Sequence, residues 1–171
     1  MGLADFFTVE NFSIHSILYF IIMVNLFMNY FGQFDHAIDE EGKNKGIFLI
    51  YSHYPTFIGL IMVTVSMSFL VNPEAHHLFA TGFFYTGIGL FQAAILANGY
   101  FNKSYLKYDK LYYGLQTAFF LIGLALSLLF SANHTIVITI ATLMTLVMEV
   151  HFTYFYITQT KKHSEVDWKL I

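Results

Sequence analysis

Residues 46–71 read GIFLIYSHYPTFIGLIMVTVSMSFLV, a continuous apolar run with no Asp, Glu, Lys or Arg. About 20 helical residues cross a hydrocarbon core about 30 Å thick, so this run is long enough to span a membrane. Its apolar residues do not alternate with polar ones as they do in the strands of a transmembrane barrel. Because a chain in lipid must satisfy its backbone hydrogen bonds internally, the run is predicted to form a transmembrane helix.

Similar runs occur on both sides of this segment. Together they predict five membrane-spanning helices, at residues 13–32, 46–71, 77–101, 110–130 and 135–158. The composition agrees, because only 11% of the residues are charged, against about 25% in an average globular protein. The connections are short and polar, with no linker and no sign of a second domain. We therefore predict one all-α domain, residues 1–171, that forms an integral membrane bundle in a lipid bilayer.

The lysines predict the orientation of the bundle. The chain has eight basic residues, all of them lysines outside the apolar cores of the runs. They lie in the first and third connections and in the C-terminal tail, whereas the N-terminal segment and the other connections have none. By the positive-inside rule, the N-terminus is predicted to lie outside the cell and the C-terminus in the cytoplasm. The expected location is the plasma membrane, with several passes.

Small residues recur at four-residue spacing in two consecutive runs. Gly89, Ala93 and Ala97 lie in the third run, and Gly123 and Ser127 lie in the fourth. Small side chains let the backbones of membrane helices approach closely. The spacing therefore predicts a tight antiparallel hairpin of these two helices. The alternative is that glycine and alanine are simply common in membrane helices.

Each predicted helix carries one large polar or ionisable side chain at a similar depth. At about 1.5 Å per residue, these side chains lie about 8–13 Å inside the cytoplasmic boundary. A polar group that faces hydrocarbon without a partner costs several kcal/mol. We therefore expect the five side chains to converge on a polar pocket inside the bundle, in the cytoplasmic half of the membrane. They are Asn25, His53, Gln92, Gln116 and Glu149.

Glu149 is the only carboxylate within the predicted spans. A charge at the centre of a membrane helix costs about 2.5–3.5 kcal/mol on insertion scales, and such residues usually face a cavity or a partner. Thr145 and Thr153 lie four residues before and after it, on the same helical face. This polar stripe indicates either a water-filled path with a functional carboxyl group or a hydrogen-bonded seam between helices. Threonine can also bond to the preceding turn of its own helix.

His53 is predicted to lie at a depth similar to that of Glu149. Pro55, two residues later, removes one helical hydrogen bond and tends to kink the helix. A pair of Glu149 and His53 would share a proton and titrate near neutrality. The alternative is an interior histidine bonded to a tyrosine or a carbonyl group.

Two segments carry a resemblance to a known family. Residues 51–59, YSHYPTFIG, resemble the Tyr-x-His-x-Pro-(x)3-Gly signature in the later part of the bacterial low temperature requirement A (LtrA) membrane proteins. Residues 26–31, LFMNYF, are similar to the Trp-Trp-x-Tyr-Phe-Asp ending of the preceding helix in that family. Both tryptophans are absent here, and Gly32 replaces the acid, with Asp35 three residues further on.

The resemblance covers residues 12–155 and corresponds to the C-terminal half of a typical member. It implies an integral protein of the bacterial inner membrane that is linked to growth at low temperature or stress tolerance, and it implies no reaction. If the missing half is needed for function, the resemblance implies that this chain forms a homo-oligomer or pairs with another membrane subunit.

Three functions are consistent with these observations. The first is a protein that binds or conducts a small solute, an ion or a proton through the pocket around Glu149 and His53. The second is a structural or partner-binding membrane subunit or effector, in which the polar layer only joins helices. The third is a b-type haem protein, with His53 and His151 as axial ligands.

Other classes are excluded by what the sequence lacks. The absence of cysteine excludes disulfides, thiolate metal sites and thiol nucleophiles, and no lysine lies within a span to form a retinal Schiff base. A net charge of −3 without a basic patch argues against nucleic-acid binding. There is no Gly-rich phosphate loop and no catalytic motif. We therefore predict no enzymatic activity, no cofactor and no metal, although a weak metal site at His76 and His77 beside Glu74 is conceivable.

Overall fold

The computed structural model describes residues 14–39 and 46–167, and the described chain is all-helical. Five of its helices are long and apolar enough to cross a membrane. The all-α prediction and the number of candidate spans are confirmed, whereas the orientation of the termini stays a prediction. The candidate spans are Ile14–Ala37, Leu49–Val71, His77–Phe101, Lys110–Leu129 and His134–Glu165.

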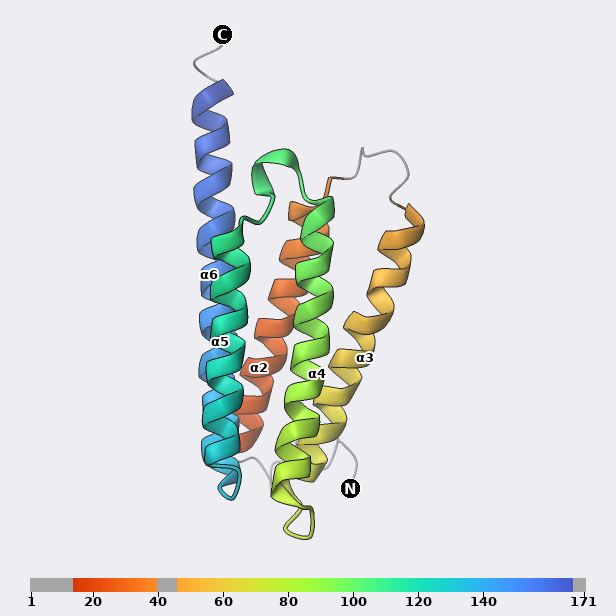
Figure 1. Cartoon of the computed structure of the whole chain (residues 1–171), viewed down its shortest axis with the longest axis vertical. Helices are drawn as coiled ribbons and strands as arrows, with labels where there is room; N and C mark the ends of the chain where they lie inside the picture. Colours follow the sequence, from red (N-terminus) through yellow and green to blue (C-terminus); the bar gives the residue numbers. More distant parts are fainter. Residues whose placement is uncertain (1–13, 40–45, 168–171) are drawn as a thin grey trace.

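The helices lie side by side in one elongated bundle (Figure 1). Their order along the chain is α2 (Ile14–Phe31), the π-helical turn η1 (Gly32–Ala37), α3 (Gly46–Val71), α4 (His77–Asn98), the short 3-10 turns η2 (Gly99–Phe101) and η3 (Ser104–Leu106), α5 (Lys110–Leu129) and α6 (His134–Asp167). Helix α6 extends beyond residue 158, where the fifth span was predicted to end, and Figure 1 shows its end rising above the other helices. The beginning predicted at residue 13 lies outside the described residues.

Two helices begin at residues whose side chains cap them. Asp109 accepts a hydrogen bond from the backbone N–H of Tyr112 at 2.7 Å, at the start of α5. Asn133 accepts one from the backbone N–H of Ile136 at 3.2 Å, at the start of α6. Both side chains satisfy N–H groups that have no partner within the helix. These caps explain why the helices begin directly after the short polar connections.

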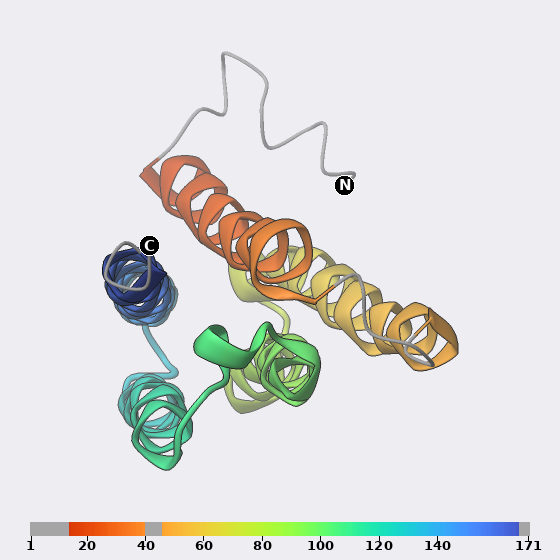
Figure 2. The ribbon, with the colours of Figure 1, turned by 90° about the horizontal axis from the view of Figure 1, so that it is seen from above.

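The closest helix pair is α3 with α4. A Cβ atom added at Gly59 would lie 2.8 Å from the carbonyl oxygen of Gly87, and one added at Gly87 would lie 2.9 Å from the backbone nitrogen of Val63. The two glycines therefore permit a backbone contact that no larger residue allows. Seen from above in Figure 2, α4 lies beside α3, and α5 lies beside α6.

The predicted tight hairpin of the third and fourth spans is replaced by this α3–α4 pair. A pocket lined by Gly89 and Ala93 opens between α4 and α5. The small residues meet large side chains instead of a backbone: a Cβ atom at Gly89 would lie 2.9 Å from the ring of Phe120, and Gly123 packs against Met144 of α6. Ala93 and Ala97 are exposed, and Ser127 is buried and bonded to the Tyr85 hydroxyl group at 2.7 Å.

The first and last helices run in the same direction and in register. Three hydrogen bonds between two side chains join α2 to α6, and in each of these the partners are 120 positions apart in the chain. A constant separation means that the two helices run parallel. The bonded pairs are His15–Thr135 at 2.8 Å, Asn25–Thr145 at 3.1 Å and Asn29–Glu149 at 3.2 Å.

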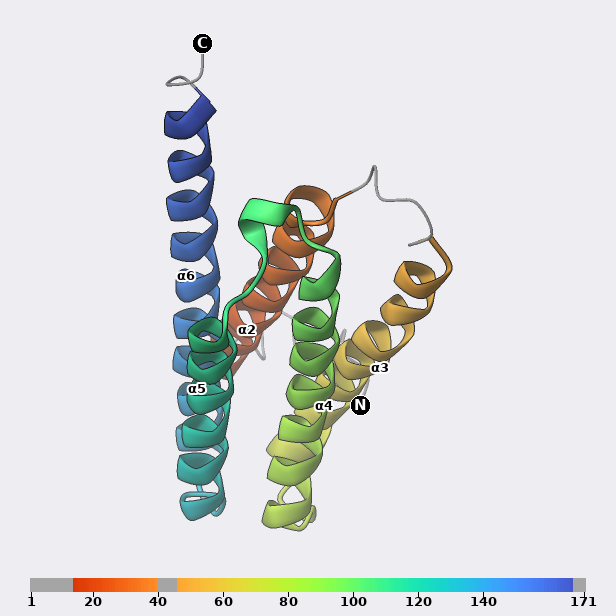
Figure 3. The same ribbon diagram turned by 45° about the horizontal axis from the view of Figure 1, so that its top comes forward.

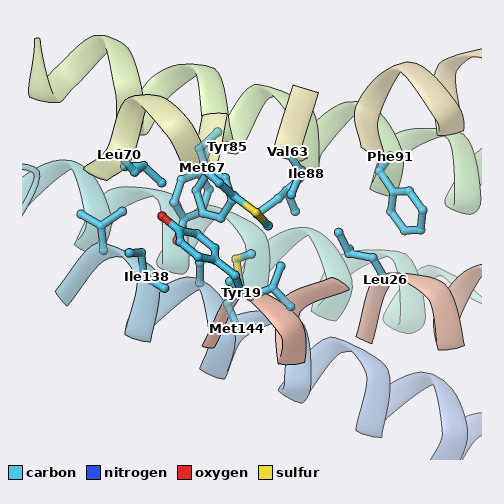
Figure 4. Packing of buried hydrophobic residues seen from close by; sticks show 14 of the residues in the cluster. Tyr19, Leu26, Val63, Met67, Leu70, Tyr85, Ile88, Phe91, Ile138 and Met144 are labelled. Carbon is cyan, nitrogen blue, oxygen red and sulfur yellow. The ribbon is translucent and has the colours of Figure 1, made fainter. Parts of the chain in front are cut away.

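Apolar side chains from four helices fill the space between them (Figure 4). Ile22 of α2, Val63 of α3, Phe84 of α4 and Ile138 of α6 are each 0% exposed. Helix α5 contributes only partly buried residues to this cluster, such as Phe119. The core therefore fixes α2, α3, α4 and α6 against one another and leaves α5 at the edge.

A second set of contacts joins two connections at one end of the bundle. The backbone N–H of Lys103 donates to the carbonyl of Ala37 at 2.9 Å. Gln33 donates to the side chain of Asn102 at 2.6 Å and accepts from the hydroxyl group of Tyr108. Burial holds the pKa of Tyr108 well above its ordinary value, so the hydroxyl group remains protonated and able to donate. These bonds fix the end of α2 against the segment between α4 and α5.

Candidate functional site

Glu149 projects from α6 toward α2 and is half-buried. Asn29 of α2 donates to its Oε2 atom at 3.2 Å, and Thr153 donates to its Oε1 atom at 3.2 Å. Asn29 is only 4% exposed, so its amide group reaches the carboxyl group from inside the bundle. Both carboxyl oxygens therefore accept a hydrogen bond, one from the neighbouring helix and one from their own helix.

A small cavity of about 10 Å³ lies beside this carboxyl group. A volume of about 10–15 Å³ accommodates a single water molecule. The cavity is too small for an organic solute but large enough for a water molecule or a bare ion. Its lining comes from α2, α4 and α6: Asn25, Leu26, Asn29, Ile88, Gln92, Thr145, Met148 and Glu149.

The polar atoms near this cavity include both amide donors and oxygen acceptors. Asn25 donates its amide to the Thr145 hydroxyl group at 3.1 Å, and that hydroxyl group donates to the carbonyl of Thr142 at 3.1 Å. Asn29 donates one amide N–H to Glu149, and its Oδ1 atom is buried without a partner. None of the lining residues is basic. The Glu149 carboxyl group and the unpartnered Oδ1 atom of Asn29 are therefore the oxygen atoms here that can accept from a proton donor or bind a cation.

Gln92 connects the cavity to α5. It donates to the Oε1 atom of Gln116 at 3.3 Å. Gln116 is 0% exposed and donates to the carbonyl of Met148 at 3.1 Å and to the hydroxyl group of Tyr112 at 3.2 Å. Hydrogen bonds thus continue from the lining of the cavity through two amide groups to the backbone of α6.

The structure brings together part of the predicted pocket. Asn25, Gln92, Thr145 and Glu149 line the one cavity. Gln116 lies one hydrogen bond away, through Gln92, and Thr153 bonds directly to Glu149, as described above.

His53 lies elsewhere. Its Nδ1 atom bonds to the carbonyl of Leu49 at 2.6 Å, and its ring contacts Phe34 at 4.3 Å and Tyr30 at 5.9 Å between centroids. Figure 3 shows that the first turns of α3 lean away from α6. His53 is therefore bonded to a carbonyl, as in the alternative interpretation, and no bond to Glu149 occurs among the described residues.

The two histidines of the haem alternative lie in different aromatic clusters. The ring of His151 stacks on Tyr112 at 4.8 Å and contacts Phe119 at 5.8 Å. In the described part of the chain these contacts involve none of the rings around His53. The geometry gives the haem alternative no support.

Asn29 is a member of the site that the depth argument does not include. The sequence contains a signal for it, because Asn25, Asn29 and Gln33 follow one another at four-residue spacing on one face of a helix. The threonines of α6 have the matching spacing. Two polar stripes with the same period predict a polar contact between the two helices.

The two segments that resemble a known family, residues 51–59 and 26–31, lie in α3 and α2, which pack in the bundle with α4 and α6. Residues 5–148 match the family model described as "Bacterial low temperature requirement A protein (LtrA)". The chain belongs to the LtrA family. The LtrA match ends immediately before Glu149, so the case for this residue rests on the structure. Searches of curated proteins and of solved structures gave no match.

Proposed function

We propose that this multi-pass LtrA-family protein binds a proton or a small monovalent cation at Glu149, between α2 and α6. The observation that carries the proposal is the cavity of about 10 Å³ beside the carboxyl group. Its size favours an ion over an organic solute. The unpartnered Oδ1 atom of Asn29 supplies a second oxygen for the same ligand.

The membrane setting strengthens this interpretation. An ionised carboxyl group inside a bilayer is costly, and such groups are usually associated with ion or proton pathways. Uptake of a proton or a cation removes the net charge of Glu149. The cost of the buried charge thus supplies a driving force for binding.

Conduction requires one further step, which we propose occurs at the α2–α6 contact. Few bonds join these helices at the cavity, namely Asn25 to Thr145 and Asn29 to Glu149. A small shift of α2 breaks both bonds and connects the cavity to the membrane surface. His53 contacts Tyr30, the residue that follows Asn29, and we propose that it responds to the same shift.

A flux assay in proteoliposomes tests the proposal. Vesicles containing a pH-sensitive or Na⁺-sensitive dye are subjected to a pH or Na⁺ gradient at a fixed membrane potential. We expect wild-type flux to exceed that of empty vesicles and E149Q to abolish the excess. E165Q is the matched control, because Glu165 is an exposed acid on the same helix. Equal flux through the wild type and E149Q would refute conduction by this site.

The register of the α2–α6 bonds favours a second candidate function, that of a structural membrane subunit. In this case the bonded pairs hold two helices together, and Glu149 has no ligand of its own. E149Q would then leave every ion-dependent signal unchanged. We also propose that the protein resides in the inner membrane as a homo-oligomer or with a partner subunit, which its mass in detergent will test.

A further inference from the structure

Three histidines lie near one another at the end of the bundle where α2, α4 and α6 begin. The rings of His77 and His134, the first residues of α4 and α6, are 5.0 Å apart between centroids at an interplanar angle of 73°. His15 of α2 bonds to Thr135, the residue next to His134, at 2.8 Å. These residues play no part in the site at Glu149.

We propose that His77 and His134 bind a divalent transition-metal ion of the zinc class, with His15 as the third ligand. Two imidazole rings that bind one tetrahedral ion at about 2.0–2.1 Å hold their centres about 5 Å apart. The observed separation of 5.0 Å is compatible with a shared ion.

The hydrogen bonding of the two rings supports this assignment. The Nδ1 atoms of His77 and His134 are both buried and have no hydrogen-bond partner. A buried ring nitrogen without a partner is costly unless a ligand satisfies it. Imidazole is a preferred ligand for zinc, copper and nickel, whereas calcium and magnesium prefer oxygen. The site therefore selects transition metals over the hard cations.

His77 and His134 are the part of the site that is already in place. Among the described residues, no group of three His, Cys, Asp or Glu side chains could hold a metal ion as the side chains are placed, so the third ligand requires a change of rotamer. His15 completes the set when its ring turns from Thr135 toward the pair, and water fills the remaining position. The N-termini of α2, α4 and α6 lie in this region, and their positive dipole ends weaken the binding of a cation. We therefore expect moderate rather than tight affinity.

Titration of the protein with Zn²⁺ and Co²⁺ tests the proposal. The full chain is purified in a neutral detergent without a polyhistidine tag and is freed of metal with a chelator. We expect one equivalent of Zn²⁺ to bind, and Co²⁺ to give the visible absorption of a tetrahedral complex. Mg²⁺ should not compete. The absence of saturable Zn²⁺ binding to the wild type would overturn the proposal.

Substitutions locate the site. H77A and H134A should each raise the dissociation constant by at least about tenfold, the lower end of what loss of an outer-shell partner costs. H15A should raise it less. H76A is the matched control, since His76 is the exposed neighbour of His77 and should leave binding unchanged. Equal affinity of H77A and H76A would contradict the assignment.

A measurement on the wild type avoids any effect of substitution on folding. Zn²⁺ should protect His77 and His134 from acylation by diethylpyrocarbonate, as quantified by mass spectrometry of peptides. His76 should remain reactive in the same experiment. Protection of all three histidines, or of none, would count against a site at this pair.

Discussion

Replacement of Glu149 by glutamine and by leucine gives different predictions for stability. The amide introduced by E149Q has the shape of the carboxyl group and keeps one oxygen to accept the bond from Asn29. Its N–H group is a new donor, and the Oδ1 atom of Asn29 is a buried acceptor without a partner. E149L removes the acceptors for both Asn29 and Thr153.

The expected magnitudes follow from these bonds. An interhelical hydrogen bond in a membrane protein contributes about 0.6 kcal/mol on average and about 1.7 kcal/mol at most. A buried donor that loses its partner costs about 1–3 kcal/mol, and Asn29 is only 4% exposed. We therefore expect E149L to lower the free energy of unfolding by about 1–3 kcal/mol. E149Q should lie within about 0.6 kcal/mol of the wild type.

Reversible unfolding in mixed micelles measures this difference, with helicity followed as the denaturing detergent is increased. E165L is the matched control on the exposed part of α6. A neutral effect of E149L would mean that the carboxyl group faces lipid and that its two bonds do not form. Equal destabilisation by E149Q and E149L would mean that the carboxylate charge itself holds the helices together, which contradicts the hydrogen-bonded arrangement.

Three further predictions concern the bundle around the site. The chain has no cysteine, so a cysteine pair can be introduced without interference. Oxidation of the double variant Asn25→Cys/Thr145→Cys should form a disulfide that gel mobility detects. A control pair whose α2 cysteine is shifted by one residue, about 100° around the helix, should form none. Gly87→Leu should lower the free energy of unfolding by about 1–3 kcal/mol through overpacking; Gly82→Leu should not, because a Cβ atom there meets nothing within 4 Å, and equal losses would refute the α3–α4 contact. Tyr108 has a raised pKa, so it contributes stability that is present below about pH 10, its unfolded value, and is lost at higher pH. Tyr108→Phe should reduce this loss in a pH series of unfolding curves, and unchanged curves would contradict the burial.

The membrane character and the number of spans were predictable from the sequence because they depend on run length and charge alone. The similar height of polar side chains on different helices could be predicted too, since it requires only the rise per residue. Asn25, Gln92 and Glu149 accordingly line one cavity. The family followed from residues 51–59 and 26–31, and the match over residues 5–148 confirms it.

Which helices are neighbours was not predictable in the same way. Small residues indicate that a helix can approach closely, but they do not identify the helix that it approaches. Gly89 therefore faces the ring of Phe120, while Gly59 and Gly87 make the close backbone contact. The neighbours of His53 could not be predicted either, because its position along the helix does not specify the direction in which α3 leans. The rotation of each helix depends on packing across the whole bundle.

Infrared difference spectroscopy of the carboxyl groups tests the central claim most directly. The protein in lipid is stepped between acidic and alkaline pH, with and without Na⁺, and the C=O stretch of protonated carboxyl groups is recorded. We predict that the wild type and E165Q show a band from a carboxyl group in apolar surroundings that changes with pH or Na⁺, and that E149Q lacks it. A spectrum that is the same in the wild type and E149Q would contradict the binding of a proton or a cation at Glu149.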